Sequence, residues 1–408
     1  MDATQATGNP KAPPRAAVQF GRAMRDAWPL DPRLTYLNHG TVGATPRRVM
    51  AAQQAIRDEV EKQPSQFMLR ELTSITIGVP RKDKPRMRVA ADQVAEFVGA
   101  RGDDLVFVEN ATTGANAVAR SFDWEPGDEA ILTDLGYGGV SNGVRFGTRE
   151  RGATVRVVTM PYPPTPERMI EAIESAIGPR TRMVVIDHIC SESALLLPVA
   201  EIVTRCHARG VAVLVDGAHA PGAIALDIPS IGADWYVANL HKWAFAPRSS
   251  GILWAGPERQ RTLHPTVISW GLDQGFTAEF DLLGIRDPSC HLAAPAGIAY
   301  QRELGLDALR AYNHDLAWRG AQLLAERWGS RFEVPESMVG TMATVPLPER
   351  VGGDRDQAAR LRDALLYEDS IEVQMHAWRG RTWVRISGQV YNDEEDLSRL
   401  AEAVSRRI

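Results

Sequence analysis

Val211–Ala220 reads Val-Ala-Val-Leu-Val-Asp-Gly-Ala-His-Ala, and Asn239–Trp243, a little further on, reads Asn-Leu-His-Lys-Trp. The first stretch is an apolar run of strand length that ends in a carboxylate and then turns at a glycine. The second follows another apolar run and carries a lysine beside apolar neighbours. Strands of parallel sheets are buried on both faces, and ligands bind beyond the carboxyl ends of such strands. The two stretches therefore predict a parallel α/β sheet with a ligand site at Asp216 and Lys242.

Short apolar runs alternate with helical patterns from about residue 90 to residue 270. The runs are rich in Val and Ile and are mostly bounded by Gly, Pro or Asp, which is typical of buried strands. The expected strands are Asp104–Val108, Glu129–Thr133, Thr154–Thr159, Met183–Asp187, Val211–Asp216, Trp235–Ala238 and Gly251–Trp254. The expected helices include Gly114–Ser121, Pro166–Ala176 and Val199–Ala208. This alternation favours an α/β fold with a doubly wound, mostly parallel sheet.

The last hundred residues follow a different pattern, in which a long amphipathic helix precedes short strands and two further helices. The expected elements are helices Leu304–Trp328, Asp356–Tyr367 and Glu394–Arg406 and strands Thr341–Val345, Ile371–Met375 and Thr382–Ser387. Near the other end we expect an extended piece at Thr35–Asn38 and a helix that begins near Pro46. The expected parts are a disordered lead-in (1–17), an N-terminal segment (18–80), a large α/β domain that binds the ligand (81–290) and a small C-terminal α+β domain (291–408).

Composition excludes several classes of function. The formal net charge is −5 and the basic residues are scattered, which gives no electrostatic case for a nucleic-acid partner. No apolar stretch approaches the roughly 20 residues that a membrane span needs. The N-terminus has no apolar core after a basic start, so we expect no export signal and a cytoplasmic location. The three cysteines and nine histidines are dispersed, which argues against a disulfide framework or a metal site.

A third stretch, Val108–Ala117, follows a predicted strand and opens a predicted helix. It reads Val-Glu-Asn-Ala-Thr-Thr-Gly-Ala-Asn-Ala, and its small and hydroxyl residues leave backbone N–H groups open to an anion at the helix start. Each stretch alone has a plainer interpretation, as a helix cap for Thr112 or Asp216 and as a surface residue for Lys242. Together they describe one ligand, with a phosphate at the helix start, a cationic ring nitrogen at Asp216 and an aldehyde at Lys242.

The run Asp216–Gly222, Asp-Gly-Ala-His-Ala-Pro-Gly, followed by the His-Lys-Trp of His241–Trp243, resembles a known family. It is similar to the class V aminotransferase group of fold type I pyridoxal phosphate (PLP) enzymes, and within it to the isopenicillin N epimerase-like branch. The resemblance covers the chain from Tyr36 onward. The segments that support it are Tyr36–Gly43, Phe67–Glu71, Asp187–His188, Val384–Ser387 and Tyr391–Glu395.

The resemblance implies PLP as cofactor, held as a Schiff base on Lys242, which would also move the Cα proton of an amino-acid substrate. Asp216 would keep the pyridine nitrogen protonated and so make the ring an electron sink. His219 would lie near the ring hydroxyl. The residues implied at the phosphate are Ala111, Thr112, Asn239 and His241. The resemblance also implies a homodimer with the active site at the subunit interface.

Further residues follow from the resemblance and from departures from it. Arg385 matches the arginine that grips the substrate carboxylate, and its planar guanidinium suits that task. Asn38 and His39 are expected beside the substrate. Tyr137 stands where many relatives carry a histidine that stacks on the cofactor, and Ser191 is a candidate for the ring hydroxyl. The predicted catalytic residues are Lys242, His219 and Tyr137. In Gly284–Asp287 an isoleucine replaces a threonine of many relatives, which removes one possible phosphate contact.

The reaction type stays open at this stage. A cysteine desulfurase would need a nucleophilic cysteine within Gln374–Gly380, and this stretch has none. An epimerase needs a proton acceptor on each face of Cα, for which His39, Tyr137 or a water could join Lys242. A C–S β-lyase acting on a cysteine S-conjugate needs only the lysine and a sulfur leaving group, and we favour it by family analogy. Decarboxylating or oxidative chemistry, transamination and a non-catalytic protein of the same fold are the remaining alternatives.

Overall fold

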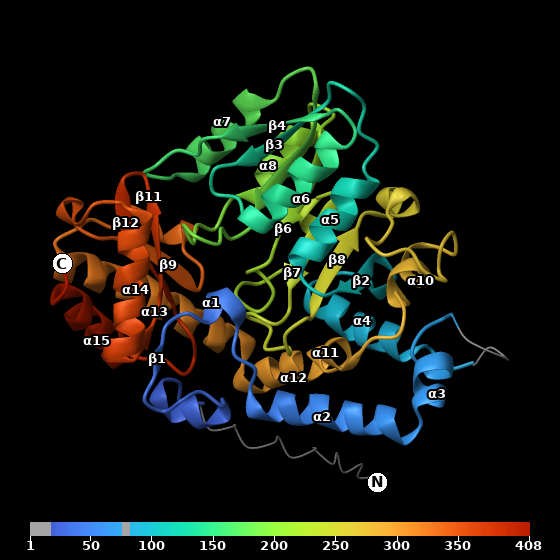
Figure 1. The fold of residues 1–408 in the computed structure, drawn as a ribbon, viewed down its shortest axis with the longest axis horizontal. Coiled ribbons are helices and arrows are strands. Elements are labelled where there is room, and N and C mark those ends of the chain that lie inside the picture. Colours follow the sequence, from blue (N-terminus) through green and yellow to red (C-terminus); the bar gives the residue numbers. More distant parts are fainter. Residues whose placement is uncertain (1–17, 76–81) are drawn as a thin grey trace, which may run out of the picture.

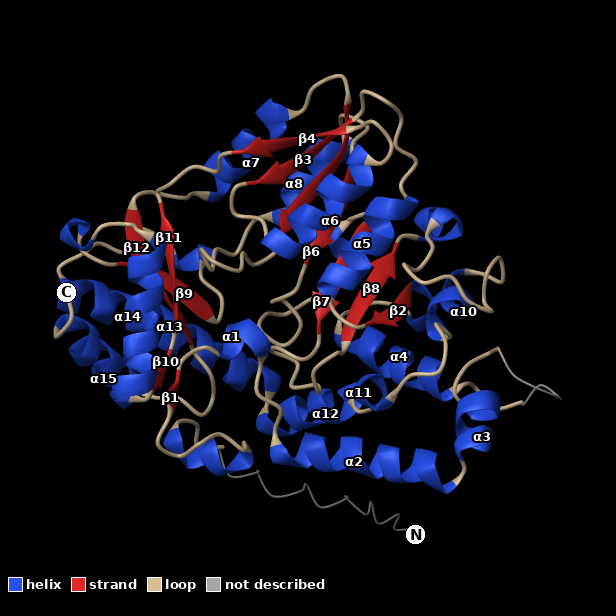
Figure 2. Cartoon of the chain, viewed as in Figure 1, coloured by secondary structure: helices blue, strands red, loops and turns tan. Residues whose placement is uncertain are grey.

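The computed structural model describes residues 18–75 and 82–408, so the predicted lead-in 1–17 lies outside the described residues. A seven-stranded sheet crosses the larger part of the molecule in the order β2-β8-β7-β6-β5-β3-β4 (Figures 1 and 2). Strand β8 is antiparallel to both neighbours, and the other pairings are parallel. The strands are β2 (Leu105–Val108), β3 (Glu129–Thr133), β4 (Thr154–Val158), β5 (Thr181–Asp187), β6 (Ala212–Asp216), β7 (Trp235–Asn239) and β8 (Gly251–Ala255).

Helices cover both faces of this sheet, which confirms the doubly wound α/β prediction. One apolar cluster joins α5 and α6 to one face, and a second joins α4, α7 and α8 to the other. The central strands β6, β7 and β8 are buried along their whole length, as their unbroken apolar sequences predict. The helices are α4 (Arg86–Phe97), α5 (Ala111–Ser121), α6 (Gly138–Arg149), α7 (Pro166–Ala176), α8 (Val199–His207), α9 (Ile228–Ile231), α10 (Phe276–Asp281), α11 (Ser289–Leu292) and α12 (Ala294–Leu304).

The C-terminal part is built around a three-stranded antiparallel sheet in the order β11-β12-β9. Its elements are α13 (Leu306–Trp328), β9 (Met342–Pro346), α14 (Arg355–Asp369), β10 (Ile371–Glu372), β11 (Gln374–Trp378), β12 (Arg381–Ser387) and α15 (Glu394–Ser405). The N-terminal elements are β1 (Thr35–Tyr36), α1 (His39–Val42), α2 (Arg47–Lys62) and α3 (Pro64–Gln66). Strand β1 pairs in parallel with β10. The N-terminal segment therefore packs against the C-terminal part.

Two predicted elements are divided in the structure. The strand expected at Ile371–Met375 is two strands, because β10 pairs with β1 while β11 pairs with β12 in another sheet. The long helix expected at Leu304–Trp328 is the end of α12 followed by α13, because Gly305 takes a positive φ of 87° between them. The predicted domain boundaries remain predictions. No helix in the described parts of the chain combines the length and apolarity that a membrane crossing requires.

Candidate active site

A cavity of about 510 Å³ opens where β5, β6 and β7 end and α5 begins. Polar and charged side chains meet there because parallel strands carry their following loops to one edge of the sheet. All residues predicted at the cofactor line this cavity, which we call the first cavity. They are Ala111, Thr112, Tyr137, Ser191, Asp216, His219, Asn239, His241 and Lys242.

Lys242 lies in the loop after β7 with only 8% of its surface exposed. Burial lowers the pKa of Lys242 to about 7, although the charge of Asp216 acts in the opposite direction. The lysine Nζ lies 3.0 Å from Nε2 of His219. A lysine amine with a pKa near neutrality is partly unprotonated at neutral pH, so it can act as a nucleophile and as a base.

His219 is buried between this lysine and an indole ring. The Nε1–H of Trp243 can only donate, and it lies 3.4 Å from Nδ1 of His219. Burial, and then the charge of Lys242, lowers the pKa of His219 well below its usual value, so the ring is neutral. A neutral ring that accepts at Nδ1 carries its proton on Nε2. This N–H faces Nζ of Lys242 and donates a hydrogen bond to it when the amine is unprotonated.

Asp216 ends β6 with one carboxylate oxygen satisfied and one without a partner. Its Oδ1 accepts a hydrogen bond from the amide of Ala218 at 3.0 Å. Its Oδ2 is buried and has no hydrogen-bond partner among the described residues. Burial raises the pKa of Asp216, and the charge of Lys242 opposes this. A buried carboxylate oxygen in this state requires a cation or a proton donor from a ligand.

Asp187 also lines the first cavity, although it was not among the predicted site residues. It ends β5 and is in register with Asp216 on the neighbouring strand. Burial, and then the charge of Asp216, raises the pKa of Asp187 well above its usual value. Two neighbouring buried carboxyls favour sharing a single negative charge. The strand-end rule that singled out Asp216 applies equally to Asp187 and could have found it.

Two asparagines fix the start of α5. Asn110 caps the helix by accepting from the amide of Thr113 at 3.0 Å. The Oδ1 of Asn239 accepts from the amide of Ala111 at 2.9 Å. Asn239 therefore lines the cavity while its oxygen holds the helix start in place. The positive end of the helix dipole is thereby directed at the cavity, where it favours an anion beside Thr112.

Tyr137 precedes α6 at the open side of the first cavity. It is 48% exposed, whereas the other predicted cofactor residues are buried or half-buried. An exposed aromatic ring at this position can stack on the ring of a ligand.

Arg385 lies on β12 and is 2% exposed. Its guanidinium donates to the carbonyl of Ser191, to the hydroxyl of Thr41 and, at 3.1 Å, to Oδ1 of Asn38. Because Thr41 and Ser191 line the first cavity, the guanidinium lies directly behind its wall. Arg385 Nε is buried without a partner among the described residues. Asn38 also lies behind the wall, where its Nδ2 donates to Glu372 at 2.7 Å.

His39, which was predicted beside the substrate, lies behind the wall of the first cavity. The ring is fully buried and is absent from the wall of the first cavity. Its Nδ1 lies 2.7 Å from the hydroxyl of Tyr391, and its Nε2 lies 2.9 Å from the carbonyl of Lys242. Both ring nitrogens are therefore engaged within the protein. These partners come from positions distant in the chain, which a motif such as Tyr36–Gly43 does not reveal.

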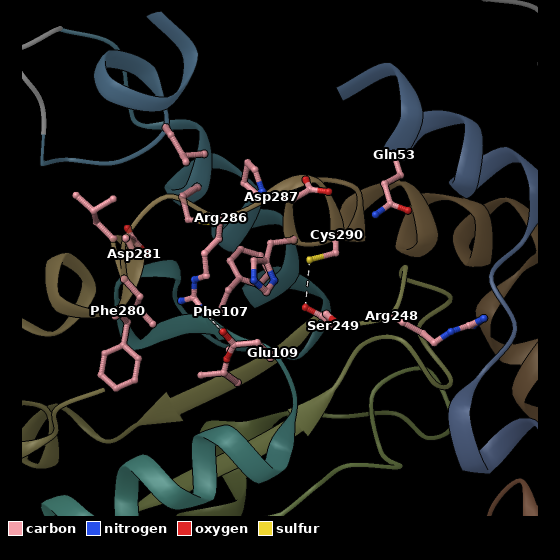
Figure 3. Close-up of a pocket in the computed structure, with 18 of the residues that line it drawn as sticks. Gln53, Phe107, Glu109, Arg248, Ser249, Phe280, Asp281, Arg286, Asp287 and Cys290 are labelled. Carbon is pink, nitrogen blue, oxygen red and sulfur yellow. Dashed lines mark hydrogen bonds and ion pairs between the residues drawn. The ribbon is translucent and has the colours of Figure 1, made fainter. Parts of the chain in front are cut away.

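A second cavity of about 340 Å³ adjoins the first and shares Glu109, Arg248 and Ser249 with it (Figure 3). Arg286 crosses this second cavity to form an ion pair with Glu109. The segment Gly284–Asp287, which departs from many relatives, forms part of its wall. The reactive lysine lies in the first cavity alone, so we place the chemistry there.

Residues 80–400 match the family model described as Aminotransferase class-V. The chain belongs to this family. It is 32% identical to isopenicillin N epimerase of Streptomyces clavuligerus over 394 residues, which cover 92% of this chain and 95% of the relative. It is 31% identical to the probable chloroplastic L-cysteine desulfhydrase of Arabidopsis thaliana over 405 residues, which cover 92% of this chain and 83% of the relative.

Solved structures show the same fold. A mutant of the enzyme C-DES with glycine covalently linked to the PLP cofactor gives a TM-score of 0.75 at 20% identity, covering 93% of this chain and 98% of that one. The prediction of a fold type I PLP enzyme related to isopenicillin N epimerase is thereby confirmed.

This member of the class-V aminotransferase family is an enzyme that depends on pyridoxal 5'-phosphate. The first cavity fits this cofactor on three independent features. The start of α5 suits a phosphate, the unpartnered Oδ2 of Asp216 suits a protonated pyridine nitrogen, and the amine of Lys242 suits an aldehyde.

Proposed function

We propose that this enzyme is a C–S β-lyase that acts on L-cysteine or a cysteine S-conjugate, with Lys242 as the reactive amine. Bound PLP supplies an electron sink that acidifies the bonds to Cα of an amino acid. The observation that carries the proposal is the state of Lys242, which is the one lysine of the described residues in the wall of the first cavity and is buried with a pKa of about 7. Such an amine takes up a proton from Cα at neutral pH without a second base.

Asp216 and His219 support this task. The Oδ2 of Asp216, which has no partner among the described residues, would accept a hydrogen bond from a bound pyridine nitrogen and stabilise its positive charge. The neutral His219 holds its proton on Nε2, towards the lysine. This proton would be placed to donate to an oxygen atom beside Lys242, such as the ring hydroxyl of the cofactor. His219 keeps this role because burial holds its ring neutral.

Arg385 orients the substrate through its carboxylate. Thr41 and Ser191 hold the guanidinium at the edge of the first cavity, with Asn38 behind it. A substrate carboxylate that displaces the Thr41 hydroxyl would form a paired contact with the guanidinium. This contact fixes which bond of Cα faces the lysine, and the geometry of that bond selects the reaction.

One observation favours elimination over inversion at Cα. His39, a candidate for a proton acceptor on the second face, is engaged with Tyr391 and with the backbone of Lys242. The similarity to the probable L-cysteine desulfhydrase supports elimination as a family reaction, and it covers the same share of this chain as the similarity to isopenicillin N epimerase. In the proposed reaction the C–S bond breaks and sulfur leaves with the bonding electron pair and takes a proton. Water then converts the remaining fragment to pyruvate and ammonia.

The test is incubation of the purified enzyme with L-cysteine and with S-substituted cysteines, followed by measurement of pyruvate and of the released thiol or sulfide. We expect equal amounts of both products, and none from Lys242→Ala. Pyruvate no higher than in the Lys242→Ala control with every cysteine derivative would overturn the lyase proposal.

The second candidate is an amino-acid epimerase. It is favoured by the 32% identity to isopenicillin N epimerase and by Tyr137, whose exposed ring lies at the open side of the first cavity. Chiral chromatography after incubation in deuterated water separates the two candidates. An epimerase gives the opposite enantiomer with deuterium at Cα and no pyruvate, and Tyr137→Phe would then slow inversion more than exchange.

We further propose that the enzyme acts as a homodimer whose partner covers the second cavity. Large apolar side chains are exposed in the chain segments before and after α10. Trp270, before the helix, is 79% exposed, and Ile285, after it, is 69% exposed. Exposed apolar groups of this size mark interaction surfaces when they gather in one region. The second cavity shares part of its wall with the first, so a partner subunit there would help to shield the reacting groups from water.

A further inference from the structure

Helix α1 lies between the C-terminal part and the large sheet (Figure 1). Its first residue, His39, bridges the side chain of Tyr391 and the backbone of Lys242, which are far apart in the chain. Its Nδ1 lies 2.7 Å from the Tyr391 hydroxyl and its Nε2 lies 2.9 Å from the backbone carbonyl of Lys242. Both contacts are buried, so water does not compete for them.

Chemistry fixes the direction of this chain of hydrogen bonds. The carbonyl of Lys242 can only accept, so Nε2 of His39 must carry the ring proton. Burial lowers the pKa of His39 to about 4, so the ring has no second proton at neutral pH. Nδ1 therefore accepts, and the Tyr391 hydroxyl donates to it. The order from donor to acceptor is Tyr391, His39 and the Lys242 carbonyl.

The surroundings leave the His39 ring little room to move. Its centroid lies 5.0 Å from that of Trp243, 6.2 Å from Phe245 and 5.8 Å from Tyr391. The helix that carries it is held equally closely. A side chain added at Gly43 would come within 1.9 Å of the carbonyl oxygen of His241, the residue before the lysine.

We propose that His39 and Tyr391 are positioning residues that fix the backbone of Lys242 and so aim its amine. The proposal rests on the proposed role of Lys242 and goes beyond it, because neither residue touches the first cavity. A lysine side chain has four rotatable bonds, so the amine is aimed well only if its backbone is fixed.

The test uses Tyr391→Phe, which removes only the hydroxyl, and a pair of variants at His39. His39→Gln keeps an N–H donor for the lysine carbonyl, whereas His39→Leu removes it. Tyr300→Phe is the matched control. Its ring belongs to the same aromatic cluster, 6.1 Å from Phe245, and its hydroxyl makes no hydrogen bond within residues 18–75 and 82–408.

Five quantities are measured on each variant: the melting temperature of the PLP-free protein, the PLP dissociation constant, the pH midpoint of the visible band of the bound cofactor, kcat and KM. We expect Tyr391→Phe to lower kcat by about tenfold with KM unchanged, because misplacing a reactive group mainly slows the chemical step. The band midpoint should shift in the same variant. His39→Leu should show the larger effects, and His39→Gln should recover part of them.

The opposite outcome is also well defined. If Tyr391→Phe and His39→Leu match Tyr300→Phe in band midpoint, PLP affinity and kcat, the positioning role is wrong, even if they melt at a lower temperature. A variant with Lys242→Ala separates this failure from failure of the proposed function. If that variant keeps the visible band of the wild type, the role of Lys242 itself is wrong.

Discussion

Three buried ionisable groups lie together in the first cavity. Asp187 and Asp216 end adjacent strands, and Lys242 lines the same wall. Burial is the largest cause of the pKa shift in all three residues, raising the pKa of the acids and lowering that of the base. Burial therefore favours the uncharged forms of these three groups. The charges of PLP, a phosphate and a ring nitrogen, complement that state.

Asp187 gives a prediction on pH. A carboxyl whose folded-state pKa lies above its ordinary value of 3.8 favours the folded state when protonated. This contribution is complete below the ordinary value and is lost as the pH rises through the folded-state pKa. We therefore expect Asp187→Asn to melt at a higher temperature than the wild type at about pH 8, and the difference to shrink towards about pH 4.

The measurement is a series of melting curves of the PLP-free proteins across this range. Asp103→Asn, at an exposed position outside the site, serves as the control and should follow the wild type at each pH. A difference that grows as the pH falls would show that the folded-state pKa of Asp187 is not raised.

Arg385 gives a prediction on substrate binding. Its planar guanidinium contacts three acceptors at once, which the single ammonium of lysine cannot reproduce. We expect Arg385→Lys to raise KM for the amino acid by about 10- to 100-fold, with a smaller change in kcat. Arg381 on the same strand donates to the carbonyl of Leu347, outside the site. The control variant Arg381→Lys should therefore leave KM unchanged. Equal KM values for both variants would remove Arg385 from the site.

At the scale of elements, the start of α5 is the part most directly tied to the phosphate. Asn110 caps this helix as Asp354 caps α14. We expect Asn110→Ala and Asp354→Ala each to lower the free energy of unfolding by about 1 kcal/mol. Only Asn110→Ala should also weaken PLP binding, because only its helix opens at the first cavity. The check is chemical denaturation beside a PLP titration, and equal PLP affinity in the two variants would contradict the assignment of the phosphate site.

Elements of the large sheet were predictable because their sequences are short, apolar and bounded. The predicted ends of β3 agree with the structure, and β6 and β7 differ by one residue. The split of Ile371–Met375 was not predictable, because an apolar run does not say which strand it will pair with. The break before α13 turns on a single glycine, Gly305, which helices can also tolerate.

The same distinction holds within the site. Residues that follow strand ends, such as Asp216 and Lys242, were predicted, since the fold brings strand ends together. Asn38 and His39 were predicted beside the substrate, but both hydrogen-bond partners of the His39 ring lie more than 200 positions away in the chain. Asn38 contacts the wall residue Thr41 and also Glu372 and Arg385, which lie far away in the chain. Sequence alone did not show these distant contacts.

At the scale of the whole molecule, the exposed apolar residues around α10 predict a dimer. We expect light scattering to give about twice the chain mass of 44.8 kDa. Ile285→Asp, in the wall segment of the second cavity, should shift the molecule towards the monomer and lower PLP affinity. Tyr367→Asp is a matched control, because Tyr367 is 80% exposed on α14, which Figure 1 places far from α10. A wild-type monomer that binds PLP and is active would contradict the dimer proposal.

The central claim is that Lys242 holds the cofactor in the first cavity. The most direct test is a visible absorption spectrum of the purified protein with PLP, before and after borohydride, followed by peptide mapping of the reduced protein. We predict a yellow band that borohydride removes, with the reduced cofactor attached to the peptide that contains Lys242, and no such band in a folded Lys242→Ala variant. A protein that takes up no PLP, or that carries the reduced cofactor on another residue, would contradict the claim.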